Sequence, residues 1–265
     1  MAPAITETPG WAAEVQRALG AAGLDVVGVA DGASYQDVLP GCRSVLVLGS
    51  GAALWDAFVA AVRRVPRLLT GELHPLDAFV RRAVAAIDPE PPATRRWIRC
   101  AADEACPVDF RTLGLRAGLG WRSALGLLLH PVRGVWFALR AACFTTSWLP
   151  RSLAPVGDGP CLACDAPCAS ACPAHAVELP FLPGQAGGWQ VDACAAWNTG
   201  PAPCVTGCAA RVACPAGAEH AYPPIQRHYH QDRRSGRRAL AAALGIADGT
   251  SGLGPDWAGW TRRSP

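Results

Sequence analysis

Eight cysteines lie close together in this chain, between Cys161 and Cys214, and they restrict how that part of the chain can fold. The surrounding stretch, Gly157 to Glu219, is rich in Cys, Pro, Ala and Gly and poor in large apolar residues. Burial of apolar surface therefore cannot hold this stretch together on its own. Metal bound by the cysteines can supply the missing stability, because metal ligation and folding are coupled. We expect a metal-stabilised module here.

The spacing of these cysteines divides them into two groups that each end in Cys-Pro. The first group reads CLACDAPCASACP, and the second is Cys194 followed by CVTGCAARVACP. Two-cluster bacterial ferredoxins contain a C-x2-C-x2-C-x3-C-P run, one residue shorter than the first group, whose fourth cysteine ligates the other cluster. This pattern predicts two [4Fe–4S] clusters with crossed ligands. The predicted ligands are Cys161, Cys164, Cys168 and Cys214 for the first cluster, and Cys194, Cys204, Cys208 and Cys172 for the second.

Structural zinc and a disulfide framework are the alternatives for the same cysteines. Zinc sites usually combine C-x2–4-C pairs, and the second group contains no C-x2-C pair. Disulfides are typical of exported proteins, whereas the N-terminal sequence lacks a basic segment followed by an apolar one. We therefore expect a cytoplasmic protein in which dense cysteines favour metal. The four upstream cysteines (Cys42, Cys100, Cys106 and Cys143) are expected to be small buried residues rather than ligands.

The rest of the composition excludes several function classes. Apolar residues make up 51% of the chain and charged residues 17%, which is typical of a folded protein with a core. The formal net charge of +3 gives no global reason to expect a nucleic-acid or membrane-surface protein. The sequence contains no lysine, which excludes a Schiff base and a P-loop. The most apolar stretch, 124–143, is interrupted by charged residues and a proline, so we expect a core segment and no membrane span.

The first 150 or so residues combine predicted helices with short apolar runs that are typical of buried strands. Predicted strands cover 25–30, 44–49, 97–101 and 134–142. Predicted helices cover 10–23, 52–69, 76–87, 110–117 and, near the end of the chain, 237–244. After Pro150 the composition changes to that of the cysteine-rich stretch. This order indicates a mixed α/β (α+β) layer structure followed by a smaller module.

Motifs before the cysteines resemble those of the epoxyqueuosine reductases. The sequence AGLGW at 117–121 is followed by a leucine-rich run and by GVWF at 134–137, and two cysteine groups come next. The segments LDVVGVA at 24–30 and LPGCRSVLVLG at 39–49 are similar to the first two strands of that family. The resemblance covers roughly residues 10–220. Reductive dehalogenases and the vertebrate cobalamin-processing chaperone are similar in the same core.

The resemblance implies a nitroreductase-like cobalamin-binding domain and a bacterial dicluster ferredoxin-like domain. We place the first at 1–155, the second at 156–219, and a C-terminal tail that packs on both at 220–265. The helical-repeat domain of the full-length tRNA-modifying enzymes has no counterpart in this sequence. That difference argues against a tRNA substrate without excluding one, and we expect a small-molecule or corrinoid substrate.

The resemblance also implies residue roles. The family's proton donor precedes its AGLGW motif, and it corresponds here to Asp103 or, in a Val-Asp pair, to Asp109. Asp109 also begins a predicted helix, where a carboxylate often caps the helix instead. The residues implied in cobalamin binding are Gly118, Leu119, Gly120, Trp121, His130, Gly134, Trp136 and Phe137.

Other histidines of the chain are expected to be structural. His74 and His175 stand alone in the sequence. A patch formed by His220, His228 and His230 with Tyr222 and Tyr229 is interpreted as a packing lid over a cluster or corrin.

The function implied by the resemblance is reductive. The two clusters are expected to pass single electrons from an external flavodoxin- or ferredoxin-type donor to cobalamin, with an acid protonating the substrate. Two alternatives stay open from the sequence. One is a cobalamin-processing protein that reduces or removes corrinoid ligands, and the other is an electron-transfer ferredoxin that binds no corrinoid.

Overall fold

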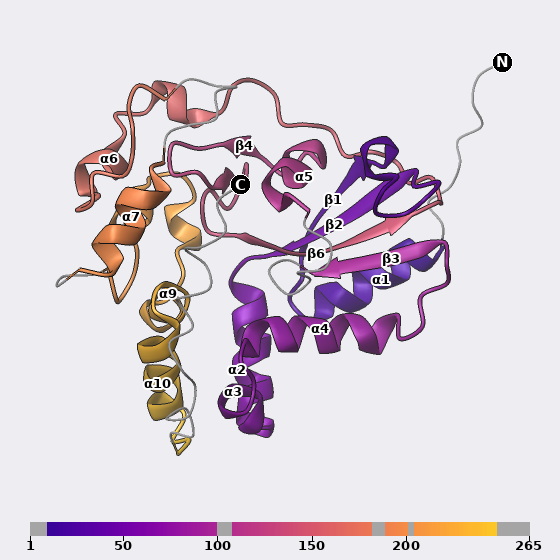
Figure 1. Ribbon diagram of the computed structural model, residues 1–265, viewed down its shortest axis with the longest axis horizontal. Helices are drawn as coiled ribbons and strands as arrows, with labels where there is room; N and C mark the ends of the chain where they lie inside the picture. Colours follow the sequence, from indigo (N-terminus) through magenta and orange to yellow (C-terminus); the bar gives the residue numbers. More distant parts are fainter. Residues whose placement is uncertain (1–9, 100–107, 182–188, 201–203, 248–265) are drawn as a thin grey trace.

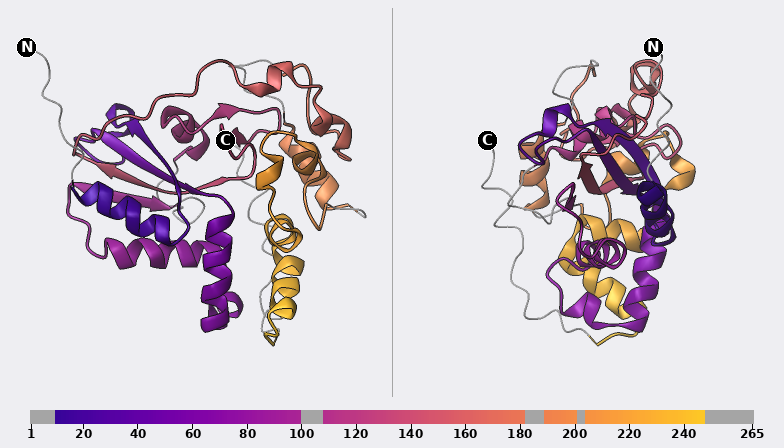
Figure 2. Two further views of the ribbon diagram at one scale, coloured as in Figure 1. Left: turned by 180° about the vertical axis from the view of Figure 1, so that it is seen from behind. Right: turned by 90° about the vertical axis from the view of Figure 1, so that its right-hand side faces the viewer.

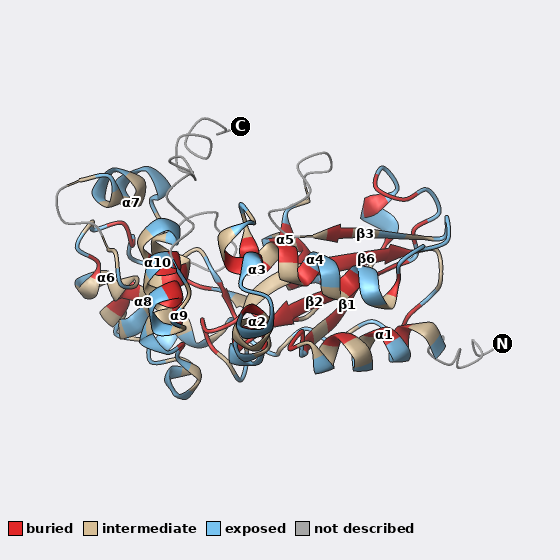
Figure 3. Cartoon of the chain, turned by 90° about the horizontal axis from the view of Figure 1, so that it is seen from below, coloured by how far each residue is buried: buried red, intermediate tan, exposed pale blue. Residues whose placement is uncertain are grey.

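A four-stranded antiparallel sheet forms the centre of the first part of the molecule (Figure 1). The computed structural model describes residues 10–99, 108–181, 189–200 and 204–247. The strands are β1 (Val26–Asp31), β2 (Ser44–Ser50), β3 (Arg95–Arg99) and β6 (Ala138–Thr145), in the order β1-β2-β6-β3. Every residue of β2 is buried, as expected for a strand covered on both faces. Figure 3 shows this burial along the sheet.

The two faces of the sheet carry separate apolar cores, because successive side chains of a strand point in opposite directions. Leu46 and Leu48 of β2 face a core built with α1 (Gly10–Ala21), α2 (Ala52–Arg64), α3 (Arg67–Thr70) and α4 (Pro75–Ile87). Val45 and Val47 face the opposite core, which includes α5 (Phe110–Arg116) and the short helix η1 (Ala33–Tyr35). The first part is therefore a layered α/β structure.

The segment after α5 joins this layer to the cysteine-rich half. It contains a small ribbon of β4 (Trp121–Arg122) and β5 (Leu128–Leu129). The cysteine-rich half has only short elements: η2 (Pro160–Ala163), α6 (Pro167–Ala171), α7 (Val191–Asn198), α8 (Ala209–Ala213) and η3 (Ala218–His220). A third apolar core combines Leu125 and Trp136 with buried cysteines and Tyr222. This core crosses the predicted boundary between residues 155 and 156, and the division into domains stays a prediction.

A helical hairpin, α9 (Pro224–Gln231) and α10 (Arg233–Ala243), follows the cysteines and lies alongside α2 and α3 (Figure 2). The rings of Tyr229 and Trp55 meet edge to face at 5.0 Å between centroids. Arg237 is buried and donates hydrogen bonds to the carbonyl oxygens of Leu69, Glu72 and Leu73. The hairpin thus packs on the helical side of the first layer.

Most predicted elements are present, and the main differences are these. The predicted helix 52–69 is two helices, because Pro66 has no N–H to continue the ladder of α2. The predicted strand 134–142 begins later, at Ala138, because Gly134 has a left-handed φ of 54° and lies in a turn. Helix α9 was not predicted, and α10 begins four residues before its predicted start. Among the described helices, none has the length and apolar character that crossing a bilayer requires.

Candidate functional site

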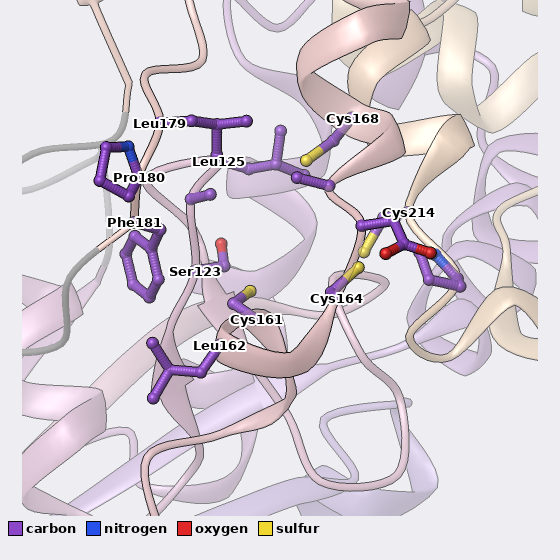
Figure 4. A pocket seen from close by; sticks show the side chains of 14 residues that line it. Ser123, Leu125, Cys161, Leu162, Cys164, Cys168, Leu179, Pro180, Phe181 and Cys214 are labelled. Atoms are coloured by element: carbon purple, nitrogen blue, oxygen red, sulfur yellow. The ribbon is translucent and has the colours of Figure 1, made fainter.

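Four cysteines from both groups surround one cavity of about 530 Å³ (Figure 4). Cys161 comes from η2, Cys164 follows it, Cys168 lies in α6, and Cys214 follows α8. Apolar side chains, including those of Leu125 and Phe181, complete the lining. This set is the one predicted for the first cluster.

The other four cysteines line a second cavity of about 400 Å³. Cys194 comes from α7, and Cys172 follows α6. Cys204 and Cys208 come from the segment that precedes α8. Each cavity therefore takes three cysteines from one group and a single cysteine from the other, in the predicted crossed arrangement. The structure brings the residues together, and their ligation of metal stays a prediction.

The crossing has a local cause in the two Cys-Pro pairs. Cys172 and Cys214 directly follow the neighbouring short helices α6 and α8, and each precedes a proline. Helical backbone is disfavoured for the residue before a proline, because the proline ring clashes with it. Both cysteines accordingly adopt extended backbone, with ψ of 110° and 122°. Each helix therefore ends at its cysteine, and the thiol of that cysteine lines the cavity formed by the three cysteines of the other group.

The thiols that raise one another's pKa belong to the same set of four. Burial raises the pKa of the Cys168 thiol, and the thiols of Cys214, Cys161 and Cys164 raise it further. Burial likewise raises the pKa of Cys194, and Cys208, Cys172 and Cys204 add to the shift. Because thiolates are the form that binds metal, these raised values mean that metal binding must expel protons from the sites.

Asn198 at the end of α7 organises the second set. Its side-chain Nδ2 donates to the carbonyl oxygen of Cys194 at 3.0 Å and lies 3.5 Å from that residue's Sγ. Its Oδ1 accepts the backbone N–H of Cys204 at 3.0 Å. Asn198 thus fixes two of the four cysteines relative to each other. No cysteine motif indicated this residue, although its position four residues after Cys194 places it one helical turn away.

Among the described residues, no three His, Cys, Asp or Glu side chains lie close enough together to hold a single metal ion. The four thiolates of a [4Fe–4S] cluster each bind a different iron, so they lie farther apart than the ligands of one ion.

The residues predicted to contact cobalamin lie between the α/β layer and the cysteine-rich half, and they line neither cysteine cavity. Leu119, Trp136 and Phe137 are buried among the chain's own side chains. Gly134 lies directly against the backbone of Ala216. The neighbouring glycines Gly118 and Gly120 both have positive φ and closely approach backbone at 153 and 129.

Two further members of that predicted set make polar contacts within the chain. Trp121 donates from its Nε1 to the carbonyl oxygen of Gly157 at 2.8 Å. His130 accepts the N–H groups of Val132 and Arg133 at its Nδ1, at 3.1 and 3.2 Å. Burial lowers the pKa of His130, and the charge of Arg133 lowers it further, so this imidazole is neutral at pH 7. Cobalamin binding by these residues stays a prediction.

The two candidate acids differ in what the structure shows. Asp103 lies outside the described residues. Asp109 caps α5, since its side chain accepts the N–H groups of Arg111 and Thr112 at 3.0 and 3.2 Å and the Thr112 hydroxyl at 2.6 Å. Burial by itself raises the pKa of Asp109, but these hydrogen bonds outweigh it and lower the pKa below its ordinary value. Such a carboxyl is ionised at neutral pH and is a poor proton donor.

Within the predicted aromatic-histidine lid, His230 reaches the second cavity, which it lines with Gln231. Its ring lies 5.7 Å from that of Tyr222, and its Nε2 is buried without a hydrogen-bond partner. His228 instead contacts the hydroxyl of Ser235 at 2.7 Å, within the hairpin. Arg211, which no sequence motif indicated, also lines the second cavity.

No protein-family model matches the chain. Curated proteins named epoxyqueuosine reductase do match it. The protein of Synechococcus sp. (strain CC9605) is 35% identical over 86 residues, which cover 32% of this chain and 25% of that protein. The protein of Synechococcus sp. (strain RCC307) is 30% identical over 152 residues, which cover 55% of this chain and 44% of that protein. The matches therefore span less than half the length of these curated relatives.

Solved structures support the same fold. An epoxyqueuosine reductase crystallised with a tRNA-Tyr epoxyqueuosine-modified stem loop has a TM-score of 0.52 at 12% identity, over 80% of this chain and 67% of that chain. The B12-trafficking protein CblC of C. elegans has a TM-score of 0.54 at 13% identity, over 88% of this chain and 96% of that chain. These neighbours have nitroreductase-like folds, so the predicted fold class is confirmed. Epoxyqueuosine reductases are thus the proteins that this chain resembles in both sequence and fold.

Proposed function

We propose that this protein is a reductase in which two [4Fe–4S] clusters carry single electrons. The observation that carries the proposal is the gathering of eight cysteines into two crossed sets of four, each around its own cavity. The reductase class comes from the curated relatives, which are named for a reduction.

The donor atoms of both sites fit the proposed clusters. A [4Fe–4S] cluster is held by four cysteine thiolates, and each cavity presents four thiols. When bound, such a cluster accepts and releases one electron at a time. The chain's own part is to hold the thiols, to exclude water with side chains such as Leu125 and Phe181, and to keep the two sites adjacent through α6 and α8.

Iron and sulfide analysis tests this assignment. Protein purified without oxygen should contain about eight irons and eight sulfides per chain, because two cubanes need that number. Cys172→Ala should damage the second cluster, and Cys214→Ala the first, although each residue belongs to the opposite run. Stoichiometric zinc without iron would refute the clusters, and loss of only the cluster of the local run in each variant would refute the crossed ligation.

Cobalamin is the electron acceptor that the resemblance implies. The described residues at the predicted positions do not form an open surface on which cobalamin could lie, because Leu119, Trp136 and Phe137 are covered by the chain's own atoms. One feature is compatible with a polar ligand, since Trp136 Nε1 is buried without a hydrogen-bond partner. Titration with hydroxocobalamin tests whether the protein binds cobalamin. Binding should shift the corrin absorption bands and raise the melting temperature, whereas no change at saturating cobalamin would favour electron transfer to another acceptor.

Asp103 is the proposed acid. Asp109 is tied into its helix cap by three hydrogen bonds, which leaves Asp103 as the candidate that the resemblance supports. Asp103→Asn should lower turnover about 10²–10⁴-fold, the usual contribution of a positioned acid, and should leave iron content unchanged. Unchanged turnover in Asp103→Asn would refute this role.

The substrate class is proposed to be a small molecule or a corrinoid. A structural neighbour was crystallised with a modified tRNA stem loop, so tRNA is the competing candidate. With a net charge of +3, tRNA binding should be weak and should collapse as salt rises. Incubation of the reduced protein with epoxyqueuosine-containing tRNA decides between the two, and efficient reduction would refute the small-molecule proposal.

A further inference from the structure

A partly buried arginine lies between the second cysteine set and the α/β layer. Arg211 belongs to α8, three residues after Cys208 and three before Cys214. Its Nε and Nη2 both donate to the carbonyl oxygen of Val135, at 3.1 and 2.6 Å. These two bonds fix the position of the guanidinium and leave it without a charged acceptor.

Aromatic rings enclose the same guanidinium. It lies 4.7 Å from the ring centroid of Trp136 and 4.9 Å from that of Tyr222. The two rings pack edge to face at 5.4 Å. A planar cation held by stacking and by a bidentate contact has little freedom to turn toward solvent.

The cation has no carboxylate partner among the ion pairs of the described residues. Burial lowers the pKa of Arg211, while Tyr222 and the Cys208 thiol act in the opposite direction. A buried cation is costly unless negative charge compensates it. The cysteines of the second set, which share a cavity with Arg211, supply this negative charge when metal binding converts them to thiolates.

The first cysteine set has different surroundings. Its lining includes the carboxylate of Asp165 and, within the described part of the chain, neither an arginine nor a histidine. The second set has Arg211 and His230 in its lining, and its one carboxylate, that of Asp192, is exposed to solvent, as is Asp165 of the first set. The two sites therefore differ in the arginine charge of their linings.

We infer that Arg211, which is fixed in the lining of the second cavity, is the counter-charge of the second cluster and holds its reduction potential above that of the first. The inference rests on the proposed function. A cluster with four thiolates is anionic, and each electron that it gains from a donor adds one negative charge. A fixed cation in a water-poor site stabilises the reduced form more than the oxidised form. Electrons supplied from outside thus move from the first cluster to the second, whose cavity Arg211 lines.

Redox titration followed by electron paramagnetic resonance tests the inference on the complete, cluster-loaded protein. Arg211→Gln removes the charge, and it should lower the reduction equilibrium constant of the second cluster at least tenfold, which is 59 mV for one electron. The first cluster should change much less. Cys194→Ala, which lacks a ligand of the second set, identifies the signal of each cluster.

Two further variants separate charge from packing. Arg211→Lys keeps the charge and should retain most of the wild-type potential. Arg234→Gln removes an exposed arginine of α10, and it should leave both potentials unchanged. Equal shifts of both clusters in Arg211→Gln, or no shift of the second, would overturn the inference. So would an Arg211→Lys shift as large as that of Arg211→Gln.

Loss of the second cluster in the glutamine variant is also informative. Retention of that cluster in Arg211→Lys would support a counter-charge, and its loss in both variants would contradict one. Wild-type protein without iron would instead refute the proposed function itself, so the two failures are distinguishable.

Discussion

One methyl group added at Gly134 should disturb the first cluster from outside the cysteine-rich segment. Gly134 has a φ of 54°, and a Cβ there would overlap the carbonyl oxygen of Ala216. Ala216 follows Cys214 and Pro215, so relief of the overlap must displace the loop that carries a first-set cysteine. Gly217 closes the contact from the other side, since a Cβ on it would overlap the backbone of Arg133.

The size of the effect follows from two contributions. Left-handed backbone costs a non-glycine residue about 1–2 kcal/mol. Forcing an extra methyl into a filled contact costs about 1–3 kcal/mol more. Gly134→Ala should therefore lower the free energy of unfolding by about 2–5 kcal/mol. For a protein of this size, each kcal/mol corresponds to a fall in melting temperature of about 2–4 °C.

Gly157→Ala is the matched control. Gly157 has a φ of 78°, but a Cβ there would meet no atom within 4 Å. It therefore carries the backbone cost alone. Thermal unfolding and iron analysis of both variants should show the larger loss of stability, and the loss of about four irons, in Gly134→Ala only. If the two variants melt together with full iron, the contact at Ala216 does not position Cys214 and the reasoning is wrong.

Three other predictions concern the α/β layer. Asp88 is buried and accepts hydrogen bonds from Arg95 and from Trp97 Nε1. Burial raises the pKa of Asp88, but these two partners outweigh burial and lower the pKa below 3.8. Its stabilisation should be complete above about pH 4 and be lost as pH falls further, so melting temperatures should decline below that pH less steeply in Asp88→Asn than in wild type. Asp109→Ala should cost about 1 kcal/mol through the lost cap without changing iron content, as urea unfolding would show; an effect near zero would contradict capping. Cys143, whose pKa burial raises to about 12, should resist thiol labelling at pH 8 by mass spectrometry, and rapid labelling would contradict its burial.

Local sequence patterns were sufficient for the elements whose burial they encode. The fully apolar run of β2 predicted a strand covered on both faces, and it is buried along its whole length. The cysteine spacing, which is similar to that of two-cluster ferredoxins, predicted the two crossed sets, and proline explains the extended backbone of the cysteine before it.

Features that depend on distant contacts could not be predicted in this way. Helix α9 begins with Pro224 and is strongly polar, and its stability comes from contacts such as Tyr229 on Trp55 rather than from its own pattern. The apolar residues of GVWF suggested a strand, but Gly134 turns the chain so that Trp136 packs under Arg211. The residues around Arg211 in the sequence do not indicate that Trp136 is its neighbour, because the fold brings Trp136 close from 75 residues away.

The crossed cysteine sets have a consequence for the order in which the sites are completed during synthesis. The first set begins with Cys161 but is complete only when Cys214 has been made. The second set begins later, with Cys172, yet it is complete earlier, at Cys208. The ribosome therefore finishes the inner site before the one that starts first in the chain. Neither site can be filled from a nascent chain that ends within the first cysteine run, so insertion of the proposed clusters would have to wait for Cys208 at the second site and for Cys214 at the first.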